Sequence, residues 1–207
     1  MKLNFGKKYY FLVALVVIVA VTVYVFVPKN SATKTEVVNQ STDAPSEEKT
    51  GSEYKWSGGP QDPKKIVIPK INVESYIQKV GVDQNKQISV PNNLFVVGWF
   101  IDSARPGEKG LSVIDGHVTG RKNDGVFKNL DQLVEGDVYK IEYGNGTIKS
   151  FKVMGKKSVP EKESVGVIFS QNPRVKSQVN LVTCSGTFDE KTRSYSERLT
   201  ITSELIP

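Results

Sequence analysis

An uninterrupted apolar run constrains this chain most strongly. Residues 9–27 (YYFLVALVVIVAVTVYVFV) contain no charged residue, glycine or proline over 19 positions. At about 1.5 Å per residue, a helix of this length crosses a hydrocarbon core roughly 30 Å thick. A strand of this length is excluded because strands rarely exceed about 10 residues. The tyrosines near both ends suit the membrane interfaces, and we predict a transmembrane helix over 9–27.

The charges before this run predict its orientation. Lys2, Lys7 and Lys8 precede it without an acidic residue, and positive charge favours the cytoplasmic side. We therefore expect residues 1–8 in the cytoplasm, a single-pass protein of the cell membrane, and an extracellular remainder. A cleaved signal peptide is the alternative, but the run exceeds the usual apolar region of about 7–15 residues and no A-x-A-like site follows.

Two further segments follow the apolar run. Residues 28–60 are rich in Ser, Thr, Asn, Glu, Lys and Gly and have no sustained apolar period, which predicts a flexible linker that tethers a folded module to the membrane. Residues 61–207 form the predicted folded domain, which is long enough to bury a core.

The folded domain has the pattern of short strands separated by turns. The strongest signal is Gly144-Asn145-Gly146 between the apolar segments Val138–Tyr143 and Thr147–Val153, which predicts a hairpin. Further strands are predicted around Ile66 and Ile68, Ile77 and Val80, Val113 and Ile114, Val179–Thr183 and Leu199–Thr202. Residues 126–134 are predicted to form a short helix capped by Asn123 or Asp124. This pattern indicates a mainly β fold, a barrel or a sandwich.

Cysteine and histidine each occur once. A single cysteine excludes an intrachain disulfide, and one cysteine with one histidine is too few for an ordinary structural zinc site. We expect no metal and no other cofactor; binding of calcium through Glu108 is not expected either, because isolated carboxylates are usually solvated. The formal net charge is +6, but no run alternates basic with aromatic residues, so no nucleic-acid partner is expected.

Both reactive side chains follow apolar strands. His117 ends SVIDGH (112–117) and Cys184 ends NLVTC (180–184). A thiol nucleophile needs a base that exchanges protons and a donor that stabilises an oxyanion, and His117 would supply the first. The alternative is a buried, inert thiol with an unrelated histidine.

Two arginines follow the cysteine and compete for the role of oxyanion donor. Arg198 opens the last predicted strand, and pairing of that strand with Val179–Thr183 would set its guanidinium near the thiol. Arg193 lies in the polar stretch FDEKTRSYSE (188–197), where a charge is normally solvated. We therefore favour Arg198.

Several motifs together resemble one family, the sortases, which are cysteine transpeptidases of Gram-positive bacteria. The resemblance covers roughly 63–207 and rests on VIDGH (113–117), LVTC (181–184), the later Arg-Leu pair (198–199) and the N-terminal anchor. Supporting pieces are PKKIVIPKINV (63–73), VPNN (90–93), GWF (98–100) and RPGEKG (105–110). The segment TCSGTFD (183–189) and Trp99 are similar to the class F branch.

This resemblance implies a fold and a reaction. The fold is an eight-stranded sortase-type β-barrel with short helices, with His117 at the end of the fourth strand, Cys184 at the end of the seventh and Arg198 on the eighth. The reaction is cleavage of an LPxTG-like sorting signal between Thr and Gly, formation of a thioacyl intermediate at Cys184, and transfer to a cell-wall amine. The implied partners are surface proteins that bear this signal and a cell-wall precursor that carries the amine.

The resemblance also implies a substrate groove and exposes one departure. The segment 157–178 resembles the family's loop between strands six and seven, which would wall the groove; ordinary core packing is the alternative for its apolar residues. The predicted substrate-binding residues are Thr183, Val165, Val167 and Ile168, with Phe169 beside them. Asp115 departs from the pattern, because the family often has a small or hydroxyl residue before Gly-His.

Two other functions compete with this interpretation. One is a membrane-tethered β-barrel module that binds a peptide or glycan without catalysis. The other is a cell-wall L,D-transpeptidase, which also uses an exported cysteine and histidine; its Ser-x-Gly-Cys-x-Arg pattern is absent from the sequence.

Overall fold

The structure is a computed structural model, which describes residues 36–39 and 45–207. Its strands are β1 (Val37–Val38), β2 (Pro63–Ile68), β3 (Val73–Val80), β4 (Val97–Phe100), β5 (Gly110–Asp115), β6 (Val138–Tyr143), β7 (Ile148–Pro160), β8 (Ser177–Asp189) and β9 (Ser194–Ile206). Its helical segments are the 3₁₀ turns η1 (Gly51–Glu53), η2 (Pro69–Ile71), η3 (Leu130–Gln132) and η4 (Glu161–Glu163) and the α-helix α2 (Ser164–Ile168).

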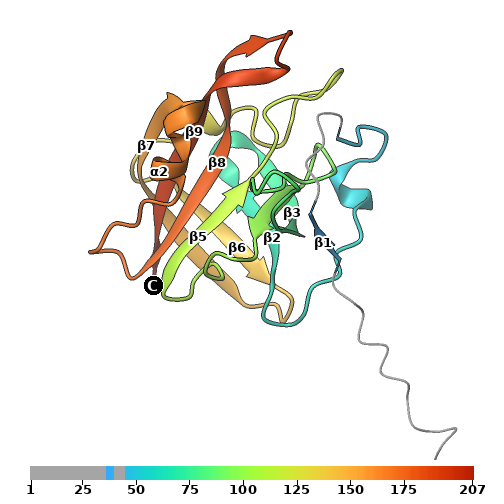
Figure 1. Ribbon diagram of the computed structural model, residues 1–207. Coiled ribbons are helices and arrows are strands. Elements are labelled where there is room, and N and C mark those ends of the chain that lie inside the picture. Colours follow the sequence, from blue (N-terminus) through green and yellow to red (C-terminus); the bar gives the residue numbers. More distant parts are fainter. Residues whose placement is uncertain (1–35, 40–44) are drawn as a thin grey trace, which may run out of the picture. The chain divides into compact units, whose positions relative to one another are not determined.

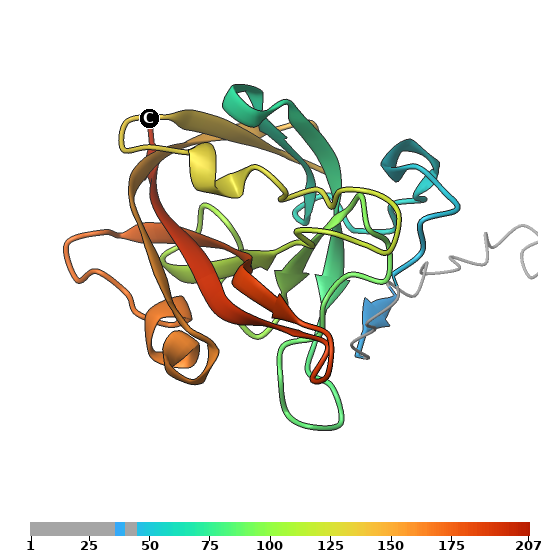
Figure 2. The same ribbon diagram turned by 90° about the horizontal axis from the view of Figure 1, so that it is seen from above.

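Strands β2 to β9 close into a barrel (Figures 1 and 2). The sheet order is β1-β3-β2-β6-β7-β9-β8-β5-β4, and a further pairing of β4 with β3 closes the barrel and leaves β1 outside it. β3 pairs with β4 and β5 with β8 in parallel, whereas the other neighbours within the barrel are antiparallel. Closure leaves few unpaired strand edges. The predicted mainly β, eight-stranded barrel with short helices is confirmed.

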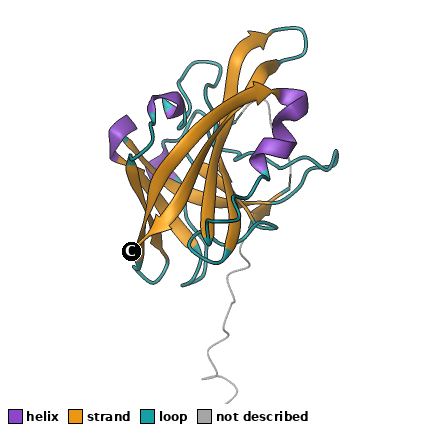
Figure 3. Cartoon of the chain, turned by 90° about the vertical axis from the view of Figure 1, so that its left-hand side faces the viewer, coloured by secondary structure: helices purple, strands orange, loops and turns teal. Residues whose placement is uncertain are grey.

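The two faces of the barrel wall bury different groups. Ile114, Leu181 and Ile201 are in register on β5, β8 and β9 and belong to the main core inside the barrel. Because side chains alternate along a strand, Val113 and Val182 face outward. They join a second, smaller core cluster that includes Ile168 of α2. The outer face of β5, β8 and β9 is therefore partly covered by the α2 segment, and Figure 3 shows the helical segments outside the strands.

The local elements follow the sequence in part. The hairpin predicted at Gly144–Gly146 is confirmed, since it joins β6 to β7 and the Tyr143 amide donates to the Thr147 carbonyl at 2.8 Å. The helix predicted over 126–134 is wrong, because only the turn η3 forms there. The Val126 amide donates to the Leu94 carbonyl and the Phe127 amide to the His117 carbonyl. These long-range bonds replace the local bonds that a helix needs.

Part of the segment expected to be a flexible linker lies against the barrel. β1 pairs in parallel with the end of β3, and Ser46 forms a bridge with Asn93. The indole of Trp56 donates to the Pro63 carbonyl at 3.2 Å. Two adjacent valines in β1 supply the strand propensity that the surrounding polar residues lack.

The predicted transmembrane span, residues 9–27, lies outside the described residues. Within 36–39 and 45–207, no helix is both long and apolar enough to cross a membrane.

Candidate active site

The predicted nucleophile and arginine lie opposite each other on two long paired strands. Cys184 of β8 and Arg198 of β9 are direct cross-strand partners, and both belong to the outward-facing set of the barrel wall. Partners in one register of an antiparallel pair have Cβ atoms about 4.5–5.5 Å apart. Figure 1 shows β8 and β9 continuing together beyond the rest of the barrel as a hairpin. Arg193 lies in the turn of this hairpin with a φ of 55°.

The end of β5 brings His117 to the same edge of the sheet. The Gly116 amide donates to the Val182 carbonyl at 3.1 Å, and the Thr183 hydroxyl donates to the Gly116 carbonyl at 2.7 Å. His117 and Cys184 are therefore each one residue beyond a hydrogen-bonded pair on neighbouring strands. The structure places Cys184 opposite Arg198, places His117 just beyond the end of the neighbouring strand β5, and leaves Arg193 at the tip of the hairpin.

A main-chain carbonyl orients the imidazole. Nε2 of His117 lies 2.7 Å from the carbonyl oxygen of Pro91. A carbonyl can only accept, so Nε2 carries a proton and Nδ1 is the nitrogen that is free to exchange one. Burial lowers the pKa of His117, and the bond to Pro91 opposes that effect.

Glycines allow the close packing behind His117. A Cβ on Gly125 would lie 2.2 Å from the His117 carbonyl oxygen, and one on Gly116 would lie 2.7 Å from the Phe127 ring. Residue 125 also donates its amide to the Val118 carbonyl at 3.0 Å. The backbone of the 117–127 loop is thus locked against itself, and this fixes where the imidazole emerges.

The charges around Cys184 oppose one another. Burial raises the pKa of this partly exposed thiol; Arg198 lowers it, and the carboxylates of Asp115 and Glu161 raise it. A raised thiol pKa and a lowered histidine pKa both favour the neutral thiol and imidazole over the thiolate and imidazolium. The free site therefore holds mainly the neutral pair.

Arg198 is held by several partners. Its Nη1 donates to the carbonyls of Tyr195 at 2.9 Å and Glu197 at 3.0 Å, and its Nη2 forms an ion pair with Glu161 of η4. The side chain is 19 % exposed. These bonds fix the plane of the guanidinium beside the thiol and tie it to the connection between β7 and β8.

The predicted substrate-binding residues differ in exposure. Val165 is 65 % exposed and Val167 is partly exposed, so both are open to a ligand. Ile168 is only 8 % exposed and belongs to the second core cluster. Thr183 is buried at 5 % and its hydroxyl bonds to Gly116, so its side chain holds the two strand ends together. Phe169 is 42 % exposed and packs edge-on against Phe100 with ring centroids 6.0 Å apart.

Side-chain amides anchor the α2 segment over the outer face. Asn180 donates to the Ile168 carbonyl at 2.8 Å, and Gln178 donates to the Ser170 carbonyl at 2.9 Å. Both donors lie on β8, on the same face as Cys184. The α2 segment therefore forms a fixed wall beside the thiol.

Sequence reasoning missed Glu161 and Pro91. Glu161 lies 37 positions before its partner Arg198, and Pro91 contributes only a backbone oxygen. Neither contact leaves a local pattern. Asp115 did leave a signal, because a carboxylate interrupts an otherwise apolar strand.

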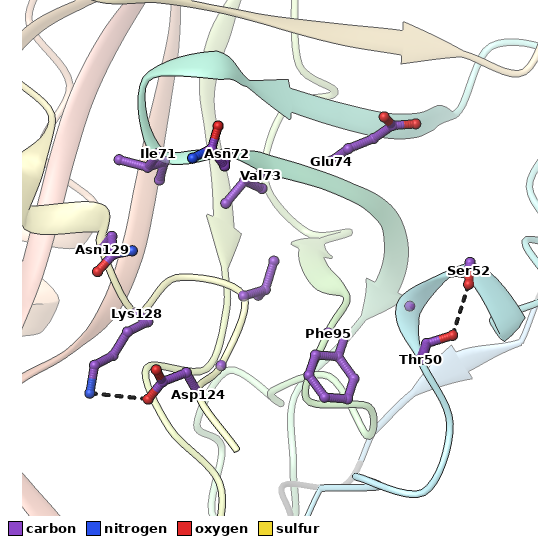
Figure 4. Close-up of a pocket in the computed structure, with 13 residues that line it drawn as sticks. Thr50, Ser52, Ile71, Asn72, Val73, Glu74, Phe95, Asp124, Lys128 and Asn129 are labelled. Atoms are coloured by element: carbon purple, nitrogen blue, oxygen red, sulfur yellow. Dashed lines mark hydrogen bonds and ion pairs between the residues drawn. The ribbon is translucent and has the colours of Figure 1, made fainter.

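A separate cavity of about 350 Å³ lies beside the loop that carries His117 (Figure 4). Its wall includes Phe95, Glu74, and an ion pair between Asp124 and Lys128. It does not include Cys184 or Arg198. Across 36–39 and 45–207, no group of three or more His, Cys, Asp and Glu side chains is placed to hold a metal ion.

Comparison with known proteins identifies the fold family. The family model described as Sortase domain matches residues 66–206. Sortase C-1 from Actinomyces oris is 29 % identical, with a TM-score of 0.53, and the match covers 70 % of this chain and 76 % of that one. No curated protein sequence matches the chain.

Two further solved structures share the fold. Sortase A from Corynebacterium diphtheriae, a lid mutant, is 24 % identical with a TM-score of 0.55, and the match covers 72 % of this chain and 73 % of that one. Streptococcus agalactiae sortase C1, in complex with MTSET, is 22 % identical with a TM-score of 0.53. That match covers 69 % of this chain and 66 % of the other, just under two thirds. The match to the family model spans most of the barrel, and the chain belongs to the sortase family.

Proposed function

We propose that this protein is a membrane-anchored cysteine transpeptidase that cleaves an LPxTG-like sorting signal and transfers the upstream protein to a cell-wall amine. The observation that carries the proposal is the cross-strand pair Cys184–Arg198 with His117 at the adjacent strand end. Family membership supports the same chemistry. The membrane anchor is the apolar run 9–27.

The first half-reaction cleaves the peptide bond. The thiolate of Cys184 attacks the threonine carbonyl carbon, and the electron pair of the C=O bond moves to oxygen. The Arg198 guanidinium stabilises this oxyanion. As the oxyanion collapses, the C–N bond breaks, and His117 gives its proton to the leaving glycine amine. The products are a thioacyl enzyme and a free peptide amine.

The second half-reaction restores the enzyme. An acceptor amine attacks the thioacyl carbon, and His117 takes its proton through the free Nδ1. The C–S bond then breaks, an amide forms and Cys184 regains its thiolate. Because the free site favours neutral Cys184 and His117, we infer that bound substrate completes the proton transfer between them.

Groove residues give this reaction a substrate surface. Val165, Val167 and Phe169 on the α2 segment are at least partly exposed beside the outer face of β8, and they offer apolar contacts to the leucine and proline of the signal. Thr183 and Ile168 act through packing. Assignment to class F remains a prediction.

The test uses the full-length chain in membranes, an LPxTG-containing peptide and a simple peptide amine. We expect an exchanged peptide product from the wild type and none from Cys184→Ala. His117→Ala should keep the fold and lose most turnover, since no other histidine exists. Peptide binding without cleavage by the wild type would instead favour the non-catalytic module.

A second experiment tests the membrane topology. Protease added from outside should release the barrel by cutting within 28–60. A secreted form that starts near Asn30 would contradict the membrane anchor.

A further inference from the structure

Asp115 is a buried carboxyl in the floor of the candidate active site. It is only 8 % exposed. It pairs with Val182 across β5 and β8, and it precedes His117 by two residues just as Val182 precedes Cys184. Side chains two residues apart share a face of a strand. The carboxyl therefore lies one step below the thiol on that face, and His117 follows it just beyond the end of β5.

The surroundings of this carboxyl are apolar. Its Oδ1 has no hydrogen-bond partner among the described residues. Its cross-strand partner on β4 is Gly98. A Cβ at Gly98 would lie 2.4 Å from that oxygen and would also contact Val80 and Pro91. A glycine at 98 is thus needed to make room for the carboxyl, and a backbone hydrogen bond of Asp115 itself only partly offsets the effect of burial.

Asp115 does not orient the histidine. In a Cys-His-Asp arrangement an ionised carboxylate accepts from the imidazole. Here Nε2 of His117 donates to the carbonyl of Pro91 at 2.7 Å. A main-chain carbonyl therefore has the orienting role, and the carboxyl is left without one.

The pKa of the Cys184 thiol on β8 responds to three charged groups from neighbouring elements. They are Arg198 on β9, Glu161 on η4 and Asp115 on β5. The Arg198 guanidinium is already bonded to Glu161 and to two carbonyls. This cation near the thiol is therefore already partly neutralised, and a thiolate and an Asp115 carboxylate in a buried site oppose each other as like charges.

We propose that Asp115 controls the charge of the active site: its neutral acid form permits the Cys184 thiolate, and its carboxylate form opposes it. Two electrostatic effects agree with this. Burial raises the pKa of Asp115 well above its usual value, and ionised Asp115 raises the pKa of the Cys184 thiol. Asp115 is thus a positioning residue for charge that acts through Cys184. The effect of Asp115 on catalysis rests on the proposed function, whereas the electrostatic coupling between Asp115 and Cys184 does not.

The experiment measures the thiol directly. Cys184 is the only cysteine, so alkylation of the full-length protein by iodoacetamide, followed by mass spectrometry between about pH 5 and pH 10, reports its ionisation. Asp115→Asn removes the charge at nearly constant shape. We expect its alkylation midpoint about one pH unit below that of the wild type. The matched control Asp102→Asn, at an exposed position after β4, should leave the midpoint unchanged.

A second variant protects the test against misfolding. Asp115→Ser also removes the charge with a smaller side chain and should shift the midpoint in the same direction. A midpoint in both variants equal to or above that of the wild type would overturn the proposal.

Peptide turnover distinguishes control of the thiol charge from an orienting role of Asp115 in a Cys-His-Asp triad. At about pH 6, Asp115→Asn should cleave peptide within about threefold of the wild type, and its activity should begin to decline at a higher pH than that of the wild type. A folded variant that loses about 100-fold or more at every pH would show an orienting carboxylate instead and overturn the proposal. If no protein cleaves peptide but the midpoint still shifts, the proposed function fails and the charge coupling stands. If the wild type cleaves peptide but the alkylation midpoint of Asp115→Asn is unshifted, the charge coupling fails and the proposed function stands.

Discussion

Cys184 and Arg198 face each other across β8 and β9, and the guanidinium lowers the pKa of the thiol that burial raises. The barrel places the pair in one register where the two strands extend beyond β5, whose pairing with β8 ends at Asp115 and Val182. A nucleophile and an oxyanion donor are thereby fixed by backbone hydrogen bonds rather than by flexible loops. This is the preorganisation that transition-state stabilisation requires.

The first prediction separates the two arginines. Arg198→Ala should lower kcat by about 100-fold or more with a smaller change in KM, because an oxyanion forms only in the transition state. Arg198→Lys should also be impaired, since lysine lacks the planar fork. Arg193→Ala, at the hairpin turn, should change turnover less than about tenfold. Steady-state kinetics on the exchange reaction would check this, and a crippled Arg193→Ala with an active Arg198→Ala would reverse the assignment.

The second prediction concerns Glu161. Its carboxylate raises the pKa of Cys184 and holds Arg198 in an ion pair. Glu161→Gln should therefore lower the thiol pKa and speed alkylation at about pH 7 roughly threefold. Glu163→Gln, an exposed carboxylate of the same turn, should alkylate at the wild-type rate. Slower alkylation of Glu161→Gln would contradict this prediction and would show that the main effect of Glu161 is to hold the Arg198 guanidinium beside the thiol.

The third prediction tests the packing behind His117. A Cβ at position 125 would lie 2.2 Å from the His117 carbonyl oxygen, whereas one at Gly155 would meet nothing within 4 Å. Gly125→Ala should lower the free energy of unfolding by about 1–3 kcal/mol and reduce turnover. Gly155→Ala should stay within about 0.5 kcal/mol of the wild type. Urea denaturation measures both, and equal stabilities would show that the 117–127 loop yields easily.

The fourth prediction gives the effect of Asp115 on stability. Burial raises the carboxyl pKa in the folded state, while the unfolded value is about 3.9. Below about pH 4 the carboxyl is protonated in both states. As the pH rises from there to the folded pKa, the unfolded chain binds fewer protons, so stability falls by at most about 1.4 kcal/mol per pH unit.

Asp115→Asn lacks this loss, so its stability advantage over the wild type should grow from about pH 4 upward and level off above the folded pKa. Urea denaturation of both proteins at several pH values measures the difference, and groups common to both cancel. An advantage that stays flat or shrinks with rising pH would show that the carboxyl is ionised in the fold.

The sequence predicted the parts of the barrel that depend on local pattern. The apolar segments of β2, β5 and β8 and the Gly144–Gly146 turn could be predicted because strands and tight turns depend on neighbouring residues. The position of Arg198 beside Cys184 followed from one assumed strand pairing. The roles of these residues remain predictions.

Contacts between residues distant in sequence could not be predicted from local patterns. The helix expected over 126–134 failed because the Val126 and Phe127 amides bond to Leu94 and His117, which are distant in sequence or in another segment. Glu161 and Pro91 meet the site only through tertiary structure. The contacts of residues 45–60 with the barrel depend likewise on surfaces that only the folded barrel presents.

The proposed function requires a covalent bond between Cys184 and the cleaved signal, and this bond can be detected by trapping it. The full-length protein is incubated with an LPxTG-containing peptide without an acceptor amine, quenched in acid and digested for mass spectrometry. We expect a thioester mass on the peptide that contains Cys184, ending at the threonine, which disappears on addition of a peptide amine. Cleavage of the signal by wild-type protein with no adduct at Cys184, or undiminished cleavage by Cys184→Ala, would contradict the account.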